Sequence, residues 1–152
     1  RLSELRTHVN YELEMIPDPK SRTGAVAHLY GVSLAATMLA KKRGLDPELA
    51  SMAAMLHDLW AYKNGSYEDH AHRGAALARE ILEGLGLTSP EETEAICSAI
   101  YHHDDKLTTD GPMEELLKDA DVVHHCMNDL SKAVKEKEKA RFENLCKEFG
   151  ME

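Results

Sequence analysis

Residues 46–60 read D-P-E-L-A-S-M-A-A-M-L-H-D-L-W. Asp46 followed by a proline is typical of a helix start, and the Leu, Ala and Met residues that follow are typical of a buried helix. The run ends in His57 and Asp58, within a helix that we expect to reach about Trp60. Because burial of an unpaired imidazole or carboxylate is costly, the sequence predicts a partner for this pair elsewhere in the chain.

The rest of the chain also predicts helices, separated by glycine and proline. Apolar residues recur with a period near 3.6, and no alternation of the strand type is evident. The expected helices cover about residues 1–16, 25–43, 46–60, 70–85, 90–103, 111–126 and 128–149. We therefore expect an all-α fold, a single domain over 1–152 built as a bundle of about six or seven helices, with a charged C-terminal helix at about 128–149.

The composition is that of a globular protein poor in aromatic residues. Aromatic residues make up 5% of the 152 residues, and a stock of Leu, Ala, Met and Val favours helices over sheets. We expect no apolar run of the roughly 18–20 residues that a membrane span needs, and no secretory signal. The three cysteines lack CxxC spacing and are typical of reduced thiols, which indicates a cytoplasmic protein.

The net charge of −9 limits the classes of partner. It argues against a general binder of nucleic acid or of anionic membranes. It also opposes phosphate substrates, unless bound cations reverse the local field. Nine histidines are the unusual count, and their placement becomes the main question.

Several of these polar residues fall on apolar helix faces. His28 and His103 lie on predicted buried stripes, His57 continues the stripe of its own helix, and Asp121 follows Leu117 by four residues. A single inward histidine is usually bonded to a carbonyl group. Several on one chain, together with buried aspartates, favour a shared transition-metal ion that supplies the missing positive charge.

This order of residues resembles the HD-domain superfamily of metal-dependent phosphohydrolases. The resemblance covers about residues 20–128 and includes the contexts H-L-Y-G-V-S-L-A-A, A-A-M-L-H-D-L and K-D-A-D-V-V. It implies that one metal is held by four residues: His28, His57, Asp58 and Asp121. Within D-A-D, the superfamily pattern of Ala-Asp before apolar residues selects Asp121, with Asp119 as the alternative.

Two further stretches, H-A-H-R-G-A-A and A-I-Y-H-H-D-D, resemble binuclear members of the superfamily. They imply His70 and His103 as ligands of a second metal, with His102 as an additional ligand because some members use two consecutive histidines. Asp58 would then bridge the two ions. His72 remains an alternative to His70, although it would point elsewhere on a helix.

The resemblance implies a cofactor of one or two divalent transition-metal ions, Fe or Mn by preference, with Co, Ni or Zn as options. Such ions lower the pKa of water and offset charge on a phosphoryl oxygen. The implied reaction is hydrolysis of a nucleotide or small phosphate ester by metal-activated hydroxide, with Asp58 as the catalytic residue. The expected partner is this small molecule, with no nucleic acid and no membrane, and the oligomeric state stays open.

Other polar residues have less defined roles. His124 and His125 follow Asp121 by three and four residues, the spacing of metal pairs on a helix. The superfamily pattern does not require them, so we interpret them as groups behind the ligands or on the surface.

The chain also departs from the resemblance. Many HD-domain phosphohydrolases carry a lysine three residues after the HD aspartate, where this chain has Ala61. This puts diadenosine tetraphosphate in doubt as a substrate, and the absence of G-Y-P argues against cyclic di-GMP. The candidates for phosphate contacts are Arg73 first and Lys63 second, with Arg22 and Lys106 as unranked alternatives.

Two other functions stay open. A few superfamily members are di-iron oxygenases, and some carry Tyr and Glu ahead of the first histidine. Between Met15 and His28 this chain has neither. The third possibility is a catalytically silent module that binds a metal or ligand. Iron content together with O₂ uptake would identify an oxygenase, since a hydrolase consumes no oxygen.

Overall fold

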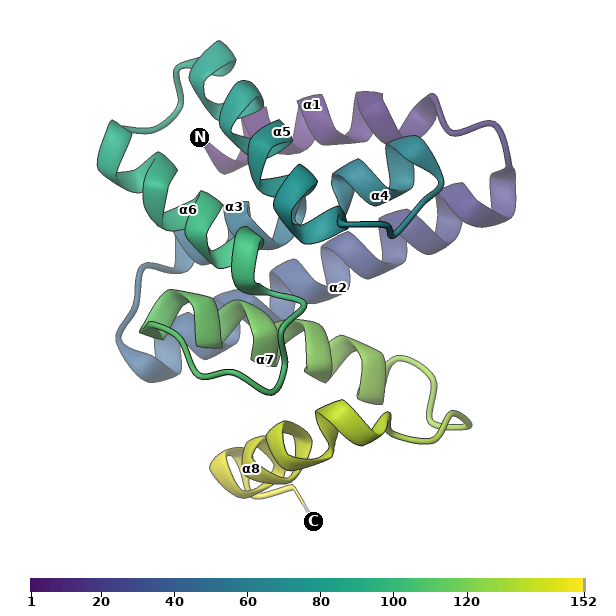
Figure 1. The fold of residues 1–152 in the computed structure, drawn as a ribbon, viewed down its shortest axis with the longest axis vertical. Coiled ribbons are helices and arrows are strands. Elements are labelled where there is room, and N and C mark those ends of the chain that lie inside the picture. Colours follow the sequence, from purple (N-terminus) through teal and green to yellow (C-terminus); the bar gives the residue numbers. More distant parts are fainter. Residues whose placement is uncertain (152) are drawn as a thin grey trace.

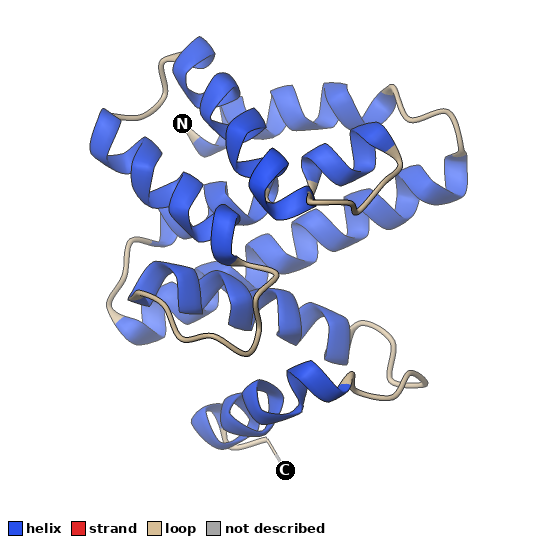
Figure 2. Cartoon of the chain, viewed as in Figure 1, coloured by secondary structure: helices blue, strands red, loops and turns tan. Residues whose placement is uncertain are grey.

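The computed structural model describes residues 1–151, and within them every regular element is a helix (Figures 1 and 2). The all-α helical bundle is therefore confirmed. The elements run in the order α1 (Leu2–Glu14), α2 (Pro19–Arg43), α3 (Pro47–Leu56), α4 (Leu59–Asn64), α5 (His70–Leu85), α6 (Pro90–His102), α7 (Pro112–Met127), the 3₁₀ helix η1 (Glu136–Glu138) and α8 (Lys139–Phe149).

The long helix α2 is the spine of the bundle and packs against α3 and α7. It starts earlier than the expected residue 25, because Asp18 accepts a hydrogen bond from the backbone N–H of Ser21 and Pro19 occupies the first turn. It ends at Gly44, whose φ of 71° is the left-handed conformation that glycine adopts without strain. Its buried face places His28 in the interior.

This helix also corrects the expectation that no segment could span a membrane. By length and composition α2 qualifies, with a mean hydropathy of 1.3 over its most apolar 18 residues. Half of that stretch is buried inside the bundle, however, and core helices of globular proteins pass the same test.

The helix expected at 46–60 is divided in two. Its first part, α3, ends at Leu56, and α4 begins at Leu59, so His57 and Asp58 form the turn between them. Asp58 leaves the helical conformation with φ −111° and ψ 5°. The ring Nδ1 of His57 donates to the carbonyl of Ala54 at 2.6 Å, which satisfies an acceptor at the helix end. No glycine or proline marks this break in the sequence.

The prediction of a continuous helix at 128–149 is also wrong. Residues 128–135 form a loop, in which the Asp129 carboxylate accepts from the backbone and hydroxyl of Ser131 and so competes with helix formation. The helix α8 begins further along the chain, at Lys139, and packs on α7 below the rest of the bundle (Figure 1). Arg141 of α8 binds Glu115 and Asp119 of α7, at 3.0 and 3.2 Å.

Candidate metal centre

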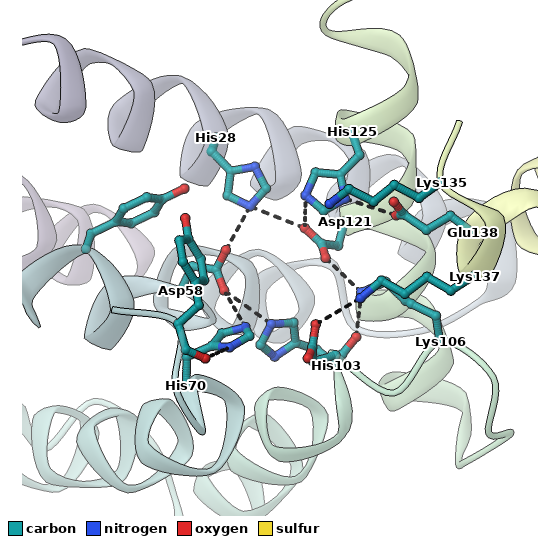
Figure 3. A pocket seen from close by; sticks show the side chains of 13 residues that line it. His28, Asp58, His70, His103, Lys106, Asp121, His125, Lys135, Lys137 and Glu138 are labelled. Carbon is teal, nitrogen blue, oxygen red and sulfur yellow. Dashed lines mark hydrogen bonds and ion pairs between the residues drawn. The ribbon is translucent and has the colours of Figure 1, made fainter. Parts of the chain in front are cut away.

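Six polar side chains from five helix regions converge in the interior, and all of them except His57 line one cavity (Figure 3). They are His28 in α2, His57 and Asp58 in the turn after α3, His70 at the start of α5, His103 at the end of α6, and Asp121 in α7. All six are buried, with at most 8% of each residue exposed. The sequence-predicted ligands therefore meet in space, with His102 as the exception.

The first donor group consists of His28, His57, Asp58 and Asp121. The Nε2 atom of His28 lies 3.1 Å from Asp58 Oδ2 and 3.2 Å from Asp121 Oδ1. The Nε2 atom of His57 lies 3.4 and 3.5 Å from the same two oxygens. Donors that share one ion at about 2.1 Å stand roughly 3.0–3.4 Å apart, so these four atoms have the spacing of a metal site.

The second donor group consists of Asp58, His70 and His103. It uses the other carboxylate oxygen of Asp58: Oδ1 lies 3.2 Å from Nε2 of His103 and 3.5 Å from Nε2 of His70. The two oxygens of Asp58 thus face different sets of histidines, as a carboxylate between two metal ions would.

The tautomers of these histidines decide what the group can hold. The Nδ1 atoms of His70 and His103 lie 2.9 and 2.7 Å from the carbonyls of Tyr67 and Ile100, to which they donate. A neutral histidine that donates from Nδ1 presents a lone pair at Nε2. Lone pairs that converge on a carboxylate oxygen repel it unless a cation lies between them.

Two buried carboxylate oxygens also indicate that a cation belongs between these donor atoms. Asp58 Oδ1 and Asp121 Oδ1 have no hydrogen-bond partner among the described residues. Buried polar atoms without partners are rare in native proteins and call for an unseen water or ion. The donor set, its spacing and these two oxygens all fit one or two divalent metal ions.

The charges within the cluster are strongly coupled. Burial opposes charge on His57, but the carboxylates of Asp58 and Asp121 outweigh it and raise the pKa of His57 to about 10. Burial would raise the pKa of Asp58, yet His57, followed by the other histidines, holds it well below its usual range. The same holds for the pKa of Asp121, where Lys106 is the main opposing charge. The aspartates are thus ionised and require nearby positive charge.

A cavity of about 300 Å³ opens over the donor groups (Figure 3). Tyr62 and Tyr67 line it, with ring centroids 6.4 Å apart. Three lysines also line it: Lys106, Lys135 and Lys137. The ammonium group of Lys106 is buried and donates to Asp121 Oδ2 at 2.8 Å and to the carbonyl of His103 at 2.6 Å.

Two histidines considered as ligands lie elsewhere. His102 turns away from both donor groups: its Nδ1 bonds to the carbonyl of Ser98, and it lines a separate surface pocket. His72 stacks on Tyr101 with centroids 4.0 Å apart and lines the same separate pocket. The helix ends just at His102, so the residue after it, His103, points into the cluster while His102 faces outward.

The structure does not bring the two preferred phosphate-binding candidates to the cavity either. Arg73 lies over the ring of Trp60, 5.0 Å from its centroid. Lys63 binds Glu12 at 2.8 Å. Neither side chain lines the cavity, whereas Lys106, one of the two unranked candidates from the sequence, does.

Asp119, the alternative to Asp121, serves the packing of the C-terminal helix. Its carboxylate lies 2.8 Å from Arg43 and 3.2 Å from Arg141. The selection of Asp121 from the D-A-D sequence therefore agrees with which carboxylate points into the cluster.

Residues after Asp121 contribute more than the sequence indicated. His125 lines the cavity, with Nε2 3.4 Å from Asp121 Oδ1 and Nδ1 3.0 Å from Glu138. The spacing of His125 from Asp121 was a signal for this position. Glu138 and the lysines at 135 and 137 had no local signal, because only the path of the loop after α7 brings them back to the cavity.

Residues 25–126 of this chain match the HD domain family. This stretch contains both donor groups and most of the bundle. The chain belongs to the HD domain family. The His57-Asp58 dipeptide lies within this stretch, in the turn between α3 and α4.

Two curated proteins are similar in sequence to parts of this chain. The chain is 32% identical over 101 residues to the protein named "Putative phosphohydrolase YueE" of Bacillus subtilis, an alignment that covers 59% of this chain and 57% of that protein. It is 45% identical over 49 residues to ribonuclease Y of Opitutus terrae, covering 32% of this chain and 9% of the ribonuclease. The chain thus spans little more than half of the first relative and a small part of the second.

The fold is shared with the crystal structure of a predicted HD superfamily hydrolase from an uncultured Thermotogales bacterium. The two superpose with a TM-score of 0.66 at 20% identity, over 95% of this chain and 87% of that one. At this identity the likeness shows the helical HD fold, and the chemistry must come from the site.

Proposed function

We propose that this HD domain is a metal-dependent phosphohydrolase that acts on a nucleotide or another small phosphate ester. The observation that carries the proposal is Asp58, whose two oxygens face two buried donor groups at the end of a cavity lined by lysines. The relative named as a phosphohydrolase supports the same reaction class.

The first donor group would hold one ion, and Asp58 with His70 and His103 would hold a second. Divalent ions bound there would supply a water of lowered pKa and offset the charge that develops on a phosphoryl oxygen. Fe and Mn are the preferred metals for such a set of imidazole and carboxylate donors, with Co, Ni and Zn as options.

The chain itself contributes orientation and charge. Asp58 would accept a hydrogen bond from the attacking water and so orient it toward the phosphorus. Lys106, held between Asp121 and the His103 carbonyl, places a buried positive charge beside the donor groups. Lys106 would thus supply the positive charge for phosphate that the sequence analysis expected from Arg73 and Lys63. It lies in the loop before α7, far along the chain from Ala61, where many HD-domain phosphohydrolases have a lysine.

The shape of the cavity supports a small substrate with an aromatic part. Its volume of about 300 Å³ is at the lower end of the range for small-molecule sites. Tyr62 and Tyr67 offer ring surfaces for a base, while Lys135 and Lys137 offer positive charge for phosphate oxygens. These two kinds of surface in one cavity favour a nucleotide-like compound.

The first test uses metal-depleted protein reloaded anaerobically with Mn²⁺ or Fe²⁺. We expect metal-dependent release of phosphate from a nucleotide or a generic phosphate ester, without O₂ uptake. Asp58→Asn and His57→Ala should lose both the bound metal and the activity, because each removes a donor from the first group.

The control is His102→Ala, which removes a neighbouring histidine that lies outside both donor groups. This variant should keep the metal content and the activity of the wild type. Full metal content in Asp58→Asn, or loss of metal in His102→Ala, would show that the site is assigned wrongly. O₂ uptake by the iron form would instead indicate an oxygenase.

A further inference from the structure

The four histidines of the two donor groups differ in how Nδ1 is held. In His57, His70 and His103, Nδ1 lies 2.6–2.9 Å from the carbonyl of the residue three positions earlier. These three residues lie at helix ends: His57 and His103 follow the last turns of α3 and α6, and His70 begins α5. His28 lies in the middle of α2, and its Nδ1 makes no hydrogen bond to a backbone carbonyl of the described residues.

The Nδ1 atom of His28 instead meets another side chain. It lies 2.9 Å from Nδ1 of His124 in α7, and the two rings meet edge to face with centroids 4.7 Å apart. One nitrogen of such a pair must donate and the other must accept. Since Nε2 of His28 faces Asp58 and Asp121, a metal there requires the proton on His28 Nδ1 and leaves His124 as the acceptor.

A glycine makes this contact possible. A methyl group at Gly31, three residues after His28 on α2, would overlap the His124 ring and stand 2.7 Å from its Nε2. At Gly24 of the same helix, an added methyl group would meet no side chain or other helix of the described residues within 4 Å. Because Gly31 has no side chain, the imidazole of His124 can lie directly against the backbone of α2 at this turn.

We infer that His124 is a positioning residue for the metal: across Gly31, it fixes the tautomer and orientation of His28. The inference rests on the metal site proposed above. Residues behind a metal-ligating histidine that accept its second N–H raise its basicity and hold its ring, and their loss weakens metal affinity by about 10- to 100-fold. His28 is the ligand whose orientation would depend on a side chain from a different helix.

The first experiment compares Gly31→Ala with Gly24→Ala. Both remove a glycine from α2, so their effects on helix formation match, but only the alanine at 31 displaces the His124 ring. The readout is the dissociation constant for Mn²⁺ or Zn²⁺, measured by calorimetric titration of metal-depleted protein. We expect binding about 10- to 100-fold weaker in Gly31→Ala, and wild-type binding in Gly24→Ala.

The second experiment separates hydrogen bonding from packing at position 124. His124→Asn keeps an acceptor near the position of Nδ1, whereas His124→Leu fills similar space without an acceptor. We expect metal affinity close to wild type in His124→Asn and about 10- to 100-fold weaker in His124→Leu. A role in packing alone would leave the leucine variant at wild-type affinity. Thermal unfolding of the metal-free variants shows that each is folded.

The outcomes separate this inference from the proposed function. If the wild-type chain binds no divalent metal, the proposed function fails and the inference fails with it. If the wild type binds metal, and Gly31→Ala and His124→Leu bind it equally well, the inference alone is overturned. Equal loss in His124→Asn and His124→Leu would also overturn it, because the acceptor would then be irrelevant.

Discussion

At the scale of single residues, Asp58 and Asp121 carry a charge that the metal-free chain balances with Lys106 and with a proton on His57. The pKa of His57 stands at about 10 because the two carboxylates outweigh its burial. A bound metal would take over this positive charge and displace the proton. A proton and a metal ion would therefore compete for the same site on His57.

This competition predicts a pH dependence for the stability of the metal-free protein. A raised pKa contributes stability that is fully present below the ordinary value of 6.5 and is lost as the pH rises through about 10. In the presence of a chelator, the thermal unfolding midpoint should fall between about pH 6.5 and 10. The Mn²⁺-loaded protein should lack this fall. Parallel pH curves for the two forms would contradict a protonated His57 in the metal-free cluster.

At the scale of helices, the site depends on how closely α5 approaches the turn between α3 and α4. Gly74 of α5 faces this turn, and a Cβ atom there would stand 3.1 Å from the backbone carbonyl of His57. Because that neighbour is backbone, it cannot rotate away. The small residue lets α5 bring His70 to within 3.5 Å of Asp58.

Gly74→Ala should therefore push α5 outward and weaken the second donor group. We expect a loss of stability of about 1–3 kcal/mol from overpacking and a metal content that falls toward one ion per chain. Metal analysis and denaturant unfolding are the measurements. The control is Gly84→Ala on the same helix, where a Cβ atom meets nothing within 4 Å. Two ions per chain in Gly74→Ala would disprove the role of this contact.

At the scale of the whole molecule, a chain of net charge −9 would bind an anion only at a place where the field is locally reversed. Lys106, Lys135 and Lys137 all line the cavity, and the last two come from the segment after α7. This segment lies outside residues 25–126, the part that matches the HD domain family. The C-terminal part of the chain thus adds positive charge to a site whose donor groups lie within the family match.

The double variant Lys135→Gln/Lys137→Gln should raise KM for a phosphate substrate by roughly 2- to 10-fold, with little change in kcat. The reason is that these side chains line the cavity outside the donor groups and would contact the substrate there. The effect should shrink at high salt, where exposed charges are screened. Lys20→Gln/Lys41→Gln changes the net charge equally, away from the cavity, and should leave KM unchanged. An equal rise of KM in both double variants would point to net charge alone.

The helical fold and most residues of the two donor groups could be predicted from the sequence, because both depend on local patterns. Helix periodicity, Asp46-Pro47 and Ser89-Pro90 mark helices that the structure contains. The sequence also indicated that His28 and Asp121 share one interior, since each lies on a buried helix face. Local patterns could not place His102, because two adjacent histidines have the same composition and differ only in the direction they face.

By itself, then, the sequence determined an all-α chain with imidazoles and carboxylates on its buried faces, since periodicity and burial cost act within a few residues. Tertiary structure alone decided three matters. It broke the helix at His57-Asp58, it turned Arg73 and Lys63 away from the cavity, and it brought His125, Lys135, Lys137 and Glu138 to it. The physical reason is that contacts between helices depend on how closely their backbones approach, as at Gly31 and Gly74.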